Sequence, residues 1–261
     1  MTEPLDPRVP AASAAGFATD MAVYERGRPS YPDDVVEWLV DGLGIEAGRR
    51  IVDLAAGTGK LTRLLVPTGA NLTAVEPSAA MRAELARNVP GVAILDGTAE
   101  AMPFADASVD AVTVGQAFHW FDVPRSTAEI SRVLVPGGGL GFVWNERDTA
   151  AEPWVAELSR LIRWEQRLAV GVPLNVELDW QEIFAEHAVG FGPLERFDTT
   201  YRQELDVDTL VQRVLSTSYI ASAPADEQRR IEDAVRSIVA GFPDRFELPY
   251  ITVAYRGVRL T

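Results

Sequence analysis

"IVDLAAGTGK" occupies residues 51–60 and combines three features: a short apolar run, an aspartate at position 53, and a glycine-containing turn. Glycines between a strand and a helix let a ligand approach the backbone, and the start of the helix offers free N–H groups. The stretch therefore predicts a strand–turn–helix unit. Its turn either holds a ligand or simply begins a helix.

Short apolar runs alternate with amphipathic helical patterns on both sides of this stretch. Strands are predicted at 50–54, 71–76, 92–95, 109–115 and 138–144, and helices at 33–44, 59–67, 78–88 and 124–135. Further helices are predicted at 151–169, 206–222 and 225–242, and further strands at 195–205 and 248–260. Such alternation is typical of an α/β protein with a parallel sheet covered on both faces.

Composition excludes several kinds of site and partner. The 261 residues carry a formal net charge of −14, which opposes binding to nucleic acid or to an anionic membrane. The chain has no cysteine, and its two histidines lack metal-ligand spacing, so no metal site is expected. No apolar run is long enough for a membrane span, and the start of the chain does not resemble a secretion signal. A cytoplasmic protein is expected, and its oligomeric state stays open.

Two acidic residues narrow the choice of ligand. The dinucleotide fingerprint fails at Thr62, and the Walker motif fails at Leu54 and Leu61. Asp53 would repel a pyrophosphate but suits a ligand with a cationic group. Glu76 ends the next predicted strand, where an acidic side chain can accept hydrogen bonds from both ribose hydroxyls. S-adenosylmethionine, which carries an ammonium, a sulfonium and a ribose, fits this pair.

Five motifs occur in an order that resembles the class I S-adenosylmethionine-dependent methyltransferases of the type 11 kind. They are "IVDLAAGTGKLT", "LTAVEPSAAM", "LDGTAEAMPF", "VDAVTVGQAFHW" and "ISRVLVPGGGLGFV". The segments "YERGRPSYP" (24–32) and "GQAFHWFD" (115–122) are similar to the trans-aconitate methyltransferase branch. The resemblance implies a seven-stranded, mostly parallel Rossmann-like sheet with helices on both faces, an antiparallel last strand and a helical cap.

The resemblance also implies a domain plan and a site. Residues 1–32 would form a lead that covers the cofactor, 33–145 the S-adenosylmethionine-binding core, and 146–261 the helical cap with the final strands. The implied cofactor-binding residues are Tyr24, Arg28, Asp53, Ala55, Gly57, Gly59, Glu76, Pro77, Met81, Thr98, Ala99, Gln116 and Ala117. His119 would be the catalytic residue, and His119 with Trp120 would contact the substrate.

Two positions depart from the family pattern. Ala55 stands where the family usually has glycine, which a methyl group tolerates if φ is negative. Thr98 stands where the family often places an aspartate that contacts the adenine amino group, so a hydroxyl or a backbone group must replace it.

Several of these residues also have simpler interpretations. Tyr24 and Arg28 could be a solvated pair instead of a clamp on the methionine carboxylate or on an acidic substrate. Met81 could pack beneath adenine or belong to the core. His119 could orient the acceptor, take its proton, or only support its loop, since a histidine titrates near neutral pH.

The predicted function is methyl transfer from S-adenosylmethionine to an oxygen or nitrogen of a small molecule, with a carboxylic acid as one candidate acceptor and S-adenosylhomocysteine as product. The alternative is a non-catalytic protein that binds the same cofactor as a sensor or scaffold. Asp53, Glu76 and Gln116 would be needed in both cases.

Overall fold

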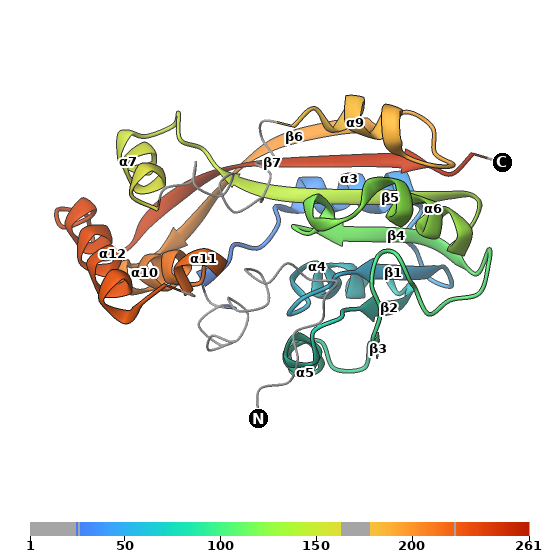
Figure 1. Ribbon diagram of the computed structural model, residues 1–261, viewed down its shortest axis with the longest axis horizontal. Coiled ribbons are helices and arrows are strands. Elements are labelled where there is room, and N and C mark those ends of the chain that lie inside the picture. Colours follow the sequence, from blue (N-terminus) through green and yellow to red (C-terminus); the bar gives the residue numbers. More distant parts are fainter. Residues whose placement is uncertain (1–24, 26, 163–177, 222, 261) are drawn as a thin grey trace. The chain divides into compact units, whose positions relative to one another are not determined.

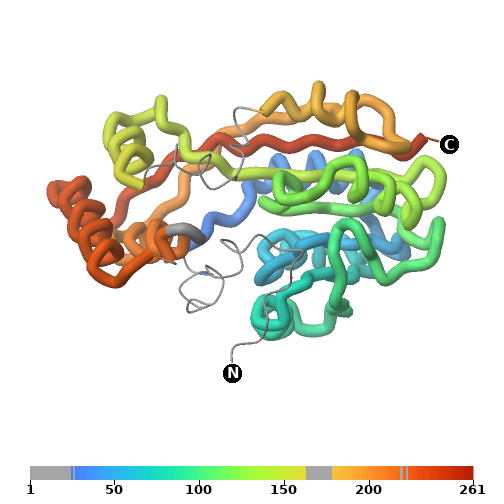
Figure 2. Tube along the Cα trace, in the orientation of Figure 1, coloured from blue at the N-terminus to red at the C-terminus, as the bar shows by residue number. Residues whose placement is uncertain are grey.

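The computed structural model describes residues 25, 27–162, 178–221 and 223–260. Its strands are β1 (Arg50–Leu54), β2 (Asn71–Val75), β3 (Ala93–Leu95), β4 (Val109–Gly115), β5 (Leu134–Arg147), β6 (Glu195–Leu205) and β7 (Phe246–Val258). They form one seven-stranded sheet in the order β3-β2-β1-β4-β5-β7-β6. Figure 2 lets the reader follow the last strand, in red, to its place between β5 and β6.

The predicted fold class is confirmed. Strands β1 to β5 pair in parallel, with Asp53 opposite both Ala74 of β2 and Thr113 of β4. The last strand of the sheet is antiparallel, as expected from the resemblance. Because the strands run in parallel, β1, β2 and β4 bring their carboxyl ends to the same edge of the sheet.

Helices and short 3₁₀ turns connect the strands (Figure 1). The helices are α3 (Asp33–Leu43), α4 (Lys60–Leu65), α5 (Ala79–Asn88), α6 (Val123–Val133), α7 (Pro153–Leu161), α9 (Trp180–His187), α10 (Val207–Leu215), α11 (Ser218–Ala221) and α12 (Ala225–Ile238), and the 3₁₀ turns are η1 (Val66–Thr68) and η2 (Phe118–Trp120). The helix predicted at 151–169 is shorter than expected, because α7 ends at Leu161; residues 163–177 lie outside the described part of the chain.

The chain divides into two units. Unit 1 consists of 1–29, 147–174 and 200–251, and unit 2 of 30–146, 175–199 and 252–261. In unit 2, the buried side chains of the sheet pack around Leu54, Val112, Phe118 and Phe142. In unit 1, α7, α10, α11 and α12 supply a separate core with residues such as Trp154, Leu158 and Val214.

None of the helices in the described residues is long and apolar enough to cross a membrane. The same residues contain no group of three or more acidic or histidine side chains that could hold a metal ion.

Candidate active site

Asp53 lies at the end of β1 in unit 2 with only 1% of its surface exposed. Its carboxylate accepts hydrogen bonds from the hydroxyls of Thr62 (2.5 Å) and Thr113 (3.2 Å). Burial raises the pKa of Asp53 to about 7, against the smaller opposite effect of these hydrogen bonds. Asp53 thus joins β1 to the first turn of α4 and to β4, while its predicted contact with a ligand stays a prediction.

The turn after β1 uses the left-handed backbone region three times. Ala55 has φ +54°, Gly57 +57° and Gly59 +87°. From the sequence, the methyl group of Ala55 is expected to be tolerated if φ is negative. That expectation is wrong, because φ is positive. Directly after Ala55, the Ala56 amide donates to the Val75 carbonyl (3.1 Å), so the turn is held against β2.

Glycine at position 55 is expected to relieve this strain. A left-handed conformation costs a non-glycine residue about 1–2 kcal/mol, whereas glycine adds about 0.4–1 kcal/mol of unfolded-chain entropy. Ala55→Gly should therefore raise the free energy of unfolding by about 0.5–1 kcal/mol in urea denaturation. Ala56→Gly, at a residue without a positive φ, is the matched control and should lower it. An equal decrease in the free energy of unfolding of both variants would contradict the strain at Ala55.

The glycines of the turn have different surroundings. A Cβ at Gly57 would meet nothing within 4 Å, whereas a Cβ at Gly59 would lie 2.8 Å from Val89 Cγ2. Gly59 thus allows α4 to begin close to α5. Gly57 leaves open space at the carboxyl edge of the sheet, which a ligand requires.

Glu76 follows β2 and is 7% exposed. One carboxylate oxygen accepts from the Gly57 amide (2.9 Å) and the other from the Ser78 amide (2.9 Å). Burial raises the pKa of Glu76, while these backbone N–H groups act in the opposite direction. Each oxygen has a further lone pair, so the side chain is held in place and can still accept hydrogen bonds from a ligand.

Arg82 fixes the loop that carries Glu76, and sequence reasoning missed it. Its guanidinium donates to the carbonyls of Glu76 (2.7 Å) and Pro77 (2.9 Å) and forms an ion pair with Asp96 (3.2 Å). An arginine in the helix after an acidic loop carries no distinctive sequence signal, because most such arginines are solvated.

Thr98 and its neighbours follow β3. Thr98 is 8% exposed, and its hydroxyl has no hydrogen-bond partner among the described residues. Ala99 and Met81 are also buried in unit 2, each with 3% of its surface exposed. A buried hydroxyl without a partner is costly unless a ligand pairs with it.

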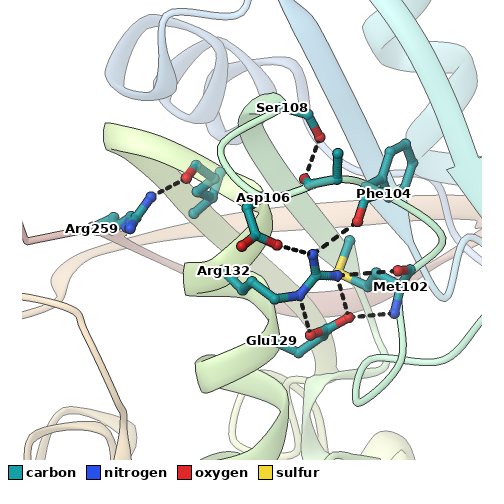
Figure 3. Close-up of polar contacts among 9 residues, drawn as sticks. Met102, Phe104, Asp106, Ser108, Glu129, Arg132 and Arg259 are labelled. Atoms are coloured by element: carbon teal, nitrogen blue, oxygen red, sulfur yellow. Dashed lines mark hydrogen bonds and ion pairs between the residues drawn. The ribbon is translucent and has the colours of Figure 1, made fainter.

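The chain after Thr98 is held by Arg132 of α6 (Figure 3). Its guanidinium binds both carboxylate oxygens of Glu129 (2.8 Å each), the Phe104 carbonyl (2.9 Å) and Asp106 (2.6 Å). Glu129 in turn accepts from the Met102 amide (2.8 Å), and the pKa of its carboxyl is lowered by Arg132. This network fixes the path of residues 102–106.

Gln116 and Ala117 follow β4, and both are half-buried. Gln116 adopts φ +60°, a conformation that concentrates at functional sites, and its side chain donates to the Asn145 carbonyl (3.2 Å). Asn145 was not predicted. Its side-chain amide donates to the Ser30 carbonyl (2.8 Å), and its side-chain oxygen accepts from the Thr252 hydroxyl (2.7 Å). Asn145 thus joins three distant segments of unit 2. A polar residue directly after the apolar run 138–144 is the signal that could have found it.

His119 lies in η2 with 9% exposure. Its Nδ1 accepts a hydrogen bond from the Trp144 indole N–H (3.2 Å). Since indole can only donate, Nδ1 carries no proton, and the proton of the neutral imidazole is on Nε2. The Trp120 ring lies 4.8 Å from the His119 ring, centroid to centroid, and is half-buried.

The predicted roles of the two residues from the N-terminal segment stay predictions. Tyr24 lies outside the described residues. Arg28 belongs to unit 1, where it donates to the Ser216 carbonyl (3.3 Å). The other predicted residues, from Asp53 to Trp120, all lie in unit 2.

Comparisons with known proteins give the family. A profile described as a methyltransferase domain matches residues 52–142. An uncharacterized methyltransferase of Mycobacterium tuberculosis is 39% identical over 92% of this chain and 94% of its own length. An uncharacterized methyltransferase of Schizosaccharomyces pombe is 34% identical over 92% of this chain and 95% of its own. A structure described as a type II methyltransferase from Anaeromyxobacter dehalogenans superposes with a TM-score of 0.64, at 25% identity over 89% of this chain and 97% of that one. The chain therefore belongs to the class I S-adenosylmethionine-dependent methyltransferases.

Proposed function

We propose that the enzyme methylates a small molecule on an oxygen or nitrogen, and that its acceptor is the carboxylate oxygen of a small organic acid such as trans-aconitate. The observation that carries this proposal is the hydrogen bond from Trp144 to His119 Nδ1. Because the remaining proton lies on Nε2, neutral His119 offers a donor at that atom. An ionised carboxylate acceptor needs a donor to orient it and no base to activate it.

The residues of unit 2 fit the cofactor. Glu76 offers an acceptor lone pair on each oxygen, which suits the ribose hydroxyls, and the open space at Gly57 leaves room beside it. We assign the adenine to the unpaired Thr98 hydroxyl and the methionine end to the Gln116–Ala117 backbone. S-adenosylmethionine supplies the electrophilic methyl group when bound. The protein contributes positioning and exclusion of water.

Two further observations support a small acceptor. The net charge of −14 opposes nucleic acid. Residues 24–32 and 115–122 resemble the trans-aconitate branch. A non-catalytic sensor is less favoured, because the relatives are named as methyltransferases along nearly their whole length.

The decisive test is product analysis. The enzyme is incubated with methyl-labelled S-adenosylmethionine and a metabolite extract, and labelled products are identified by mass spectrometry. A labelled methyl ester of a small acid would support the proposal. Label only on protein or nucleic acid would contradict it, and release of no product beyond the rate without enzyme would favour the sensor.

His119→Ala is expected to weaken binding of the acceptor and to leave binding of the cofactor unchanged. If His119 orients a carboxylate, removing one charge-assisted hydrogen bond should raise the acceptor KM about 10- to 100-fold, while S-adenosylhomocysteine affinity in calorimetry stays unchanged. A loss of roughly 10²- to 10⁴-fold in kcat at constant KM would instead indicate a general base. His187→Ala, at the exposed second histidine, is the matched control.

A further inference from the structure

Arg213 of α10 is a buried arginine in unit 1. It is 6% exposed, and its Nε is buried without a hydrogen-bond acceptor among the described residues. Among the described residues, its guanidinium has neither a carboxylate nor a backbone carbonyl as a partner. Arginine keeps its charge at all ordinary pH values, so a buried guanidinium needs an anion or several acceptors.

Other arginines of unit 1 are more exposed and do have carboxylate partners. Arg202 contacts Glu152 (3.1 Å), Arg236 contacts Asp208 (2.8 Å), and Arg245 contacts Glu204 (2.6 Å). Their side chains are 43–59% exposed, so water already solvates them. Unit 1 thus contains acidic side chains, but none of those described pairs with the buried Arg213.

The turn after α10 places a second unsatisfied group next to Arg213 in the chain. Thr217, four residues further on, is 7% exposed, and its hydroxyl has no partner among the described residues. The intervening Ser216 is satisfied, because its hydroxyl donates to the Arg213 carbonyl (2.9 Å). Arg28 donates to the Ser216 carbonyl (3.3 Å), which brings a second guanidinium to the same turn.

The backbone around Arg213 is fixed. A Cβ at Gly27 would lie 2.9 Å from both Arg213 Cα and N, so the segment before Arg28 packs directly against α10. The helix itself begins at Asp206, whose carboxylate accepts from the Thr209 amide (2.8 Å). A buried charge on a fixed helix, four residues before an unpaired hydroxyl in the chain, has the properties of a preformed anion site.

We propose that Arg213 and Thr217 bind the carboxylate of a small organic molecule. The planar guanidinium matches a carboxylate through parallel N–H···O bonds, and a threonine hydroxyl can donate a further one. The site goes beyond methyl transfer as such, because the residues that carry it belong to unit 1. The carboxylate belongs to a free organic acid, and a titration with S-adenosylhomocysteine serves as the comparison with the cofactor.

The test compares the full-length protein with Arg213→Met, Arg213→Lys and Thr217→Val. Arg230→Met, which removes an arginine with a 76% exposed side chain from α12, is the charge-matched control. Thermal unfolding is measured with acetate, succinate, trans-aconitate and inorganic phosphate, and S-adenosylhomocysteine is titrated by calorimetry. A ligand that binds only the folded protein raises the unfolding midpoint.

Wild type and Arg230→Met should be stabilised equally by at least one carboxylate, and both should bind S-adenosylhomocysteine with the same affinity. Arg213→Met should weaken that same binding about 10- to 100-fold, and Arg213→Lys should restore it only in part. Loss of succinate or trans-aconitate binding in Arg213→Met identifies a free acid as the ligand, whereas loss of S-adenosylhomocysteine binding alone would contradict the proposal. Thr217→Val should weaken the same ligand by a smaller factor.

Stability without ligand separates this site from a structural arginine. Replacing an unpaired buried charge by methionine should leave the unfolding midpoint unchanged or raise it. A strongly lowered midpoint or a failure to fold would show that the protein itself pairs the charge, and the proposal would be wrong. It would also be wrong if no carboxylate binding depended on Arg213 and Thr217, or if only phosphate binding did.

Discussion

Glu76→Ala is expected to weaken S-adenosylhomocysteine binding about 10- to 100-fold in calorimetry. A hydrogen bond to a charged group contributes about 1.5–3 kcal/mol, and the variant also leaves the amides of Gly57 and Ser78 without their acceptors. The effect should therefore combine a lost contact with a less ordered turn. Slower binding and weaker protection of residues 55–59 in hydrogen exchange should accompany the loss of affinity.

Two other variants isolate the cause. Glu76→Gln keeps one carbonyl oxygen and should retain part of the affinity, because that oxygen can still accept from a backbone amide. Asp96→Asn, at a 62% exposed carboxylate nearby that pairs with Arg82, should change the affinity little. If all three variants bind like the wild type, Glu76 does not belong to the cofactor site.

Asp53→Asn is expected to change how stability depends on pH. The pKa of Asp53 rises from 3.8 to about 7 on folding, so the folded protein keeps a proton that the unfolded chain releases. The contribution of this group to stability is complete below the unfolded pKa and is lost as pH rises through about 7. Over that range, the free energy of unfolding of Asp53→Asn should rise relative to that of the wild type by on the order of 4 kcal/mol.

The measurement is urea denaturation of both proteins between pH 4 and pH 8. The difference in free energy of unfolding between Asp53→Asn and wild type should increase towards pH 7 and then level off. Asp110→Asn provides a control without a trend in this range, because the Arg50 guanidinium lowers the pKa of Asp110. Its stabilising effect is therefore complete above about pH 4 and is lost only at lower pH. A constant difference for Asp53→Asn would mean that Asp53 is ionised throughout. With saturating S-adenosylhomocysteine, a smaller difference would indicate that the ligand ammonium lies near Asp53.

Much of the fold could be predicted because local pattern and tertiary structure agree. The run 109–115 reads as a buried strand from its apolar residues alone, and β4 occupies the same residues. The strand predicted at 195–205 likewise coincides with β6. Within the described residues, the helix predicted at 151–169 ends earlier, at Leu161, because an amphipathic pattern does not mark where a helix ends.

The site was predicted in part. Asp53 and Glu76 stand out because acidic residues at strand ends are chemically distinctive. The positive φ of Ala55 and the partner of His119 could not be found in this way. Both lie where distant segments meet: the residue after Ala55 is bonded to Val75, and His119 to Trp144 of β5. Arg213 was missed for a related reason, because "VQRVL" reads as an ordinary amphipathic helix with a solvated arginine.

The alternation of the two units along the chain limits how the protein can be shortened. The profile match at 52–142 invites expression of the first 146 residues as an independent cofactor-binding domain. That fragment would lack β7, which pairs with β5, while every residue of β5 from 138 to 146 is buried. It would therefore present a long apolar edge strand, which is a template for aggregation. A soluble minimal version would have to reconnect 252–261 to the core, for instance by circular permutation.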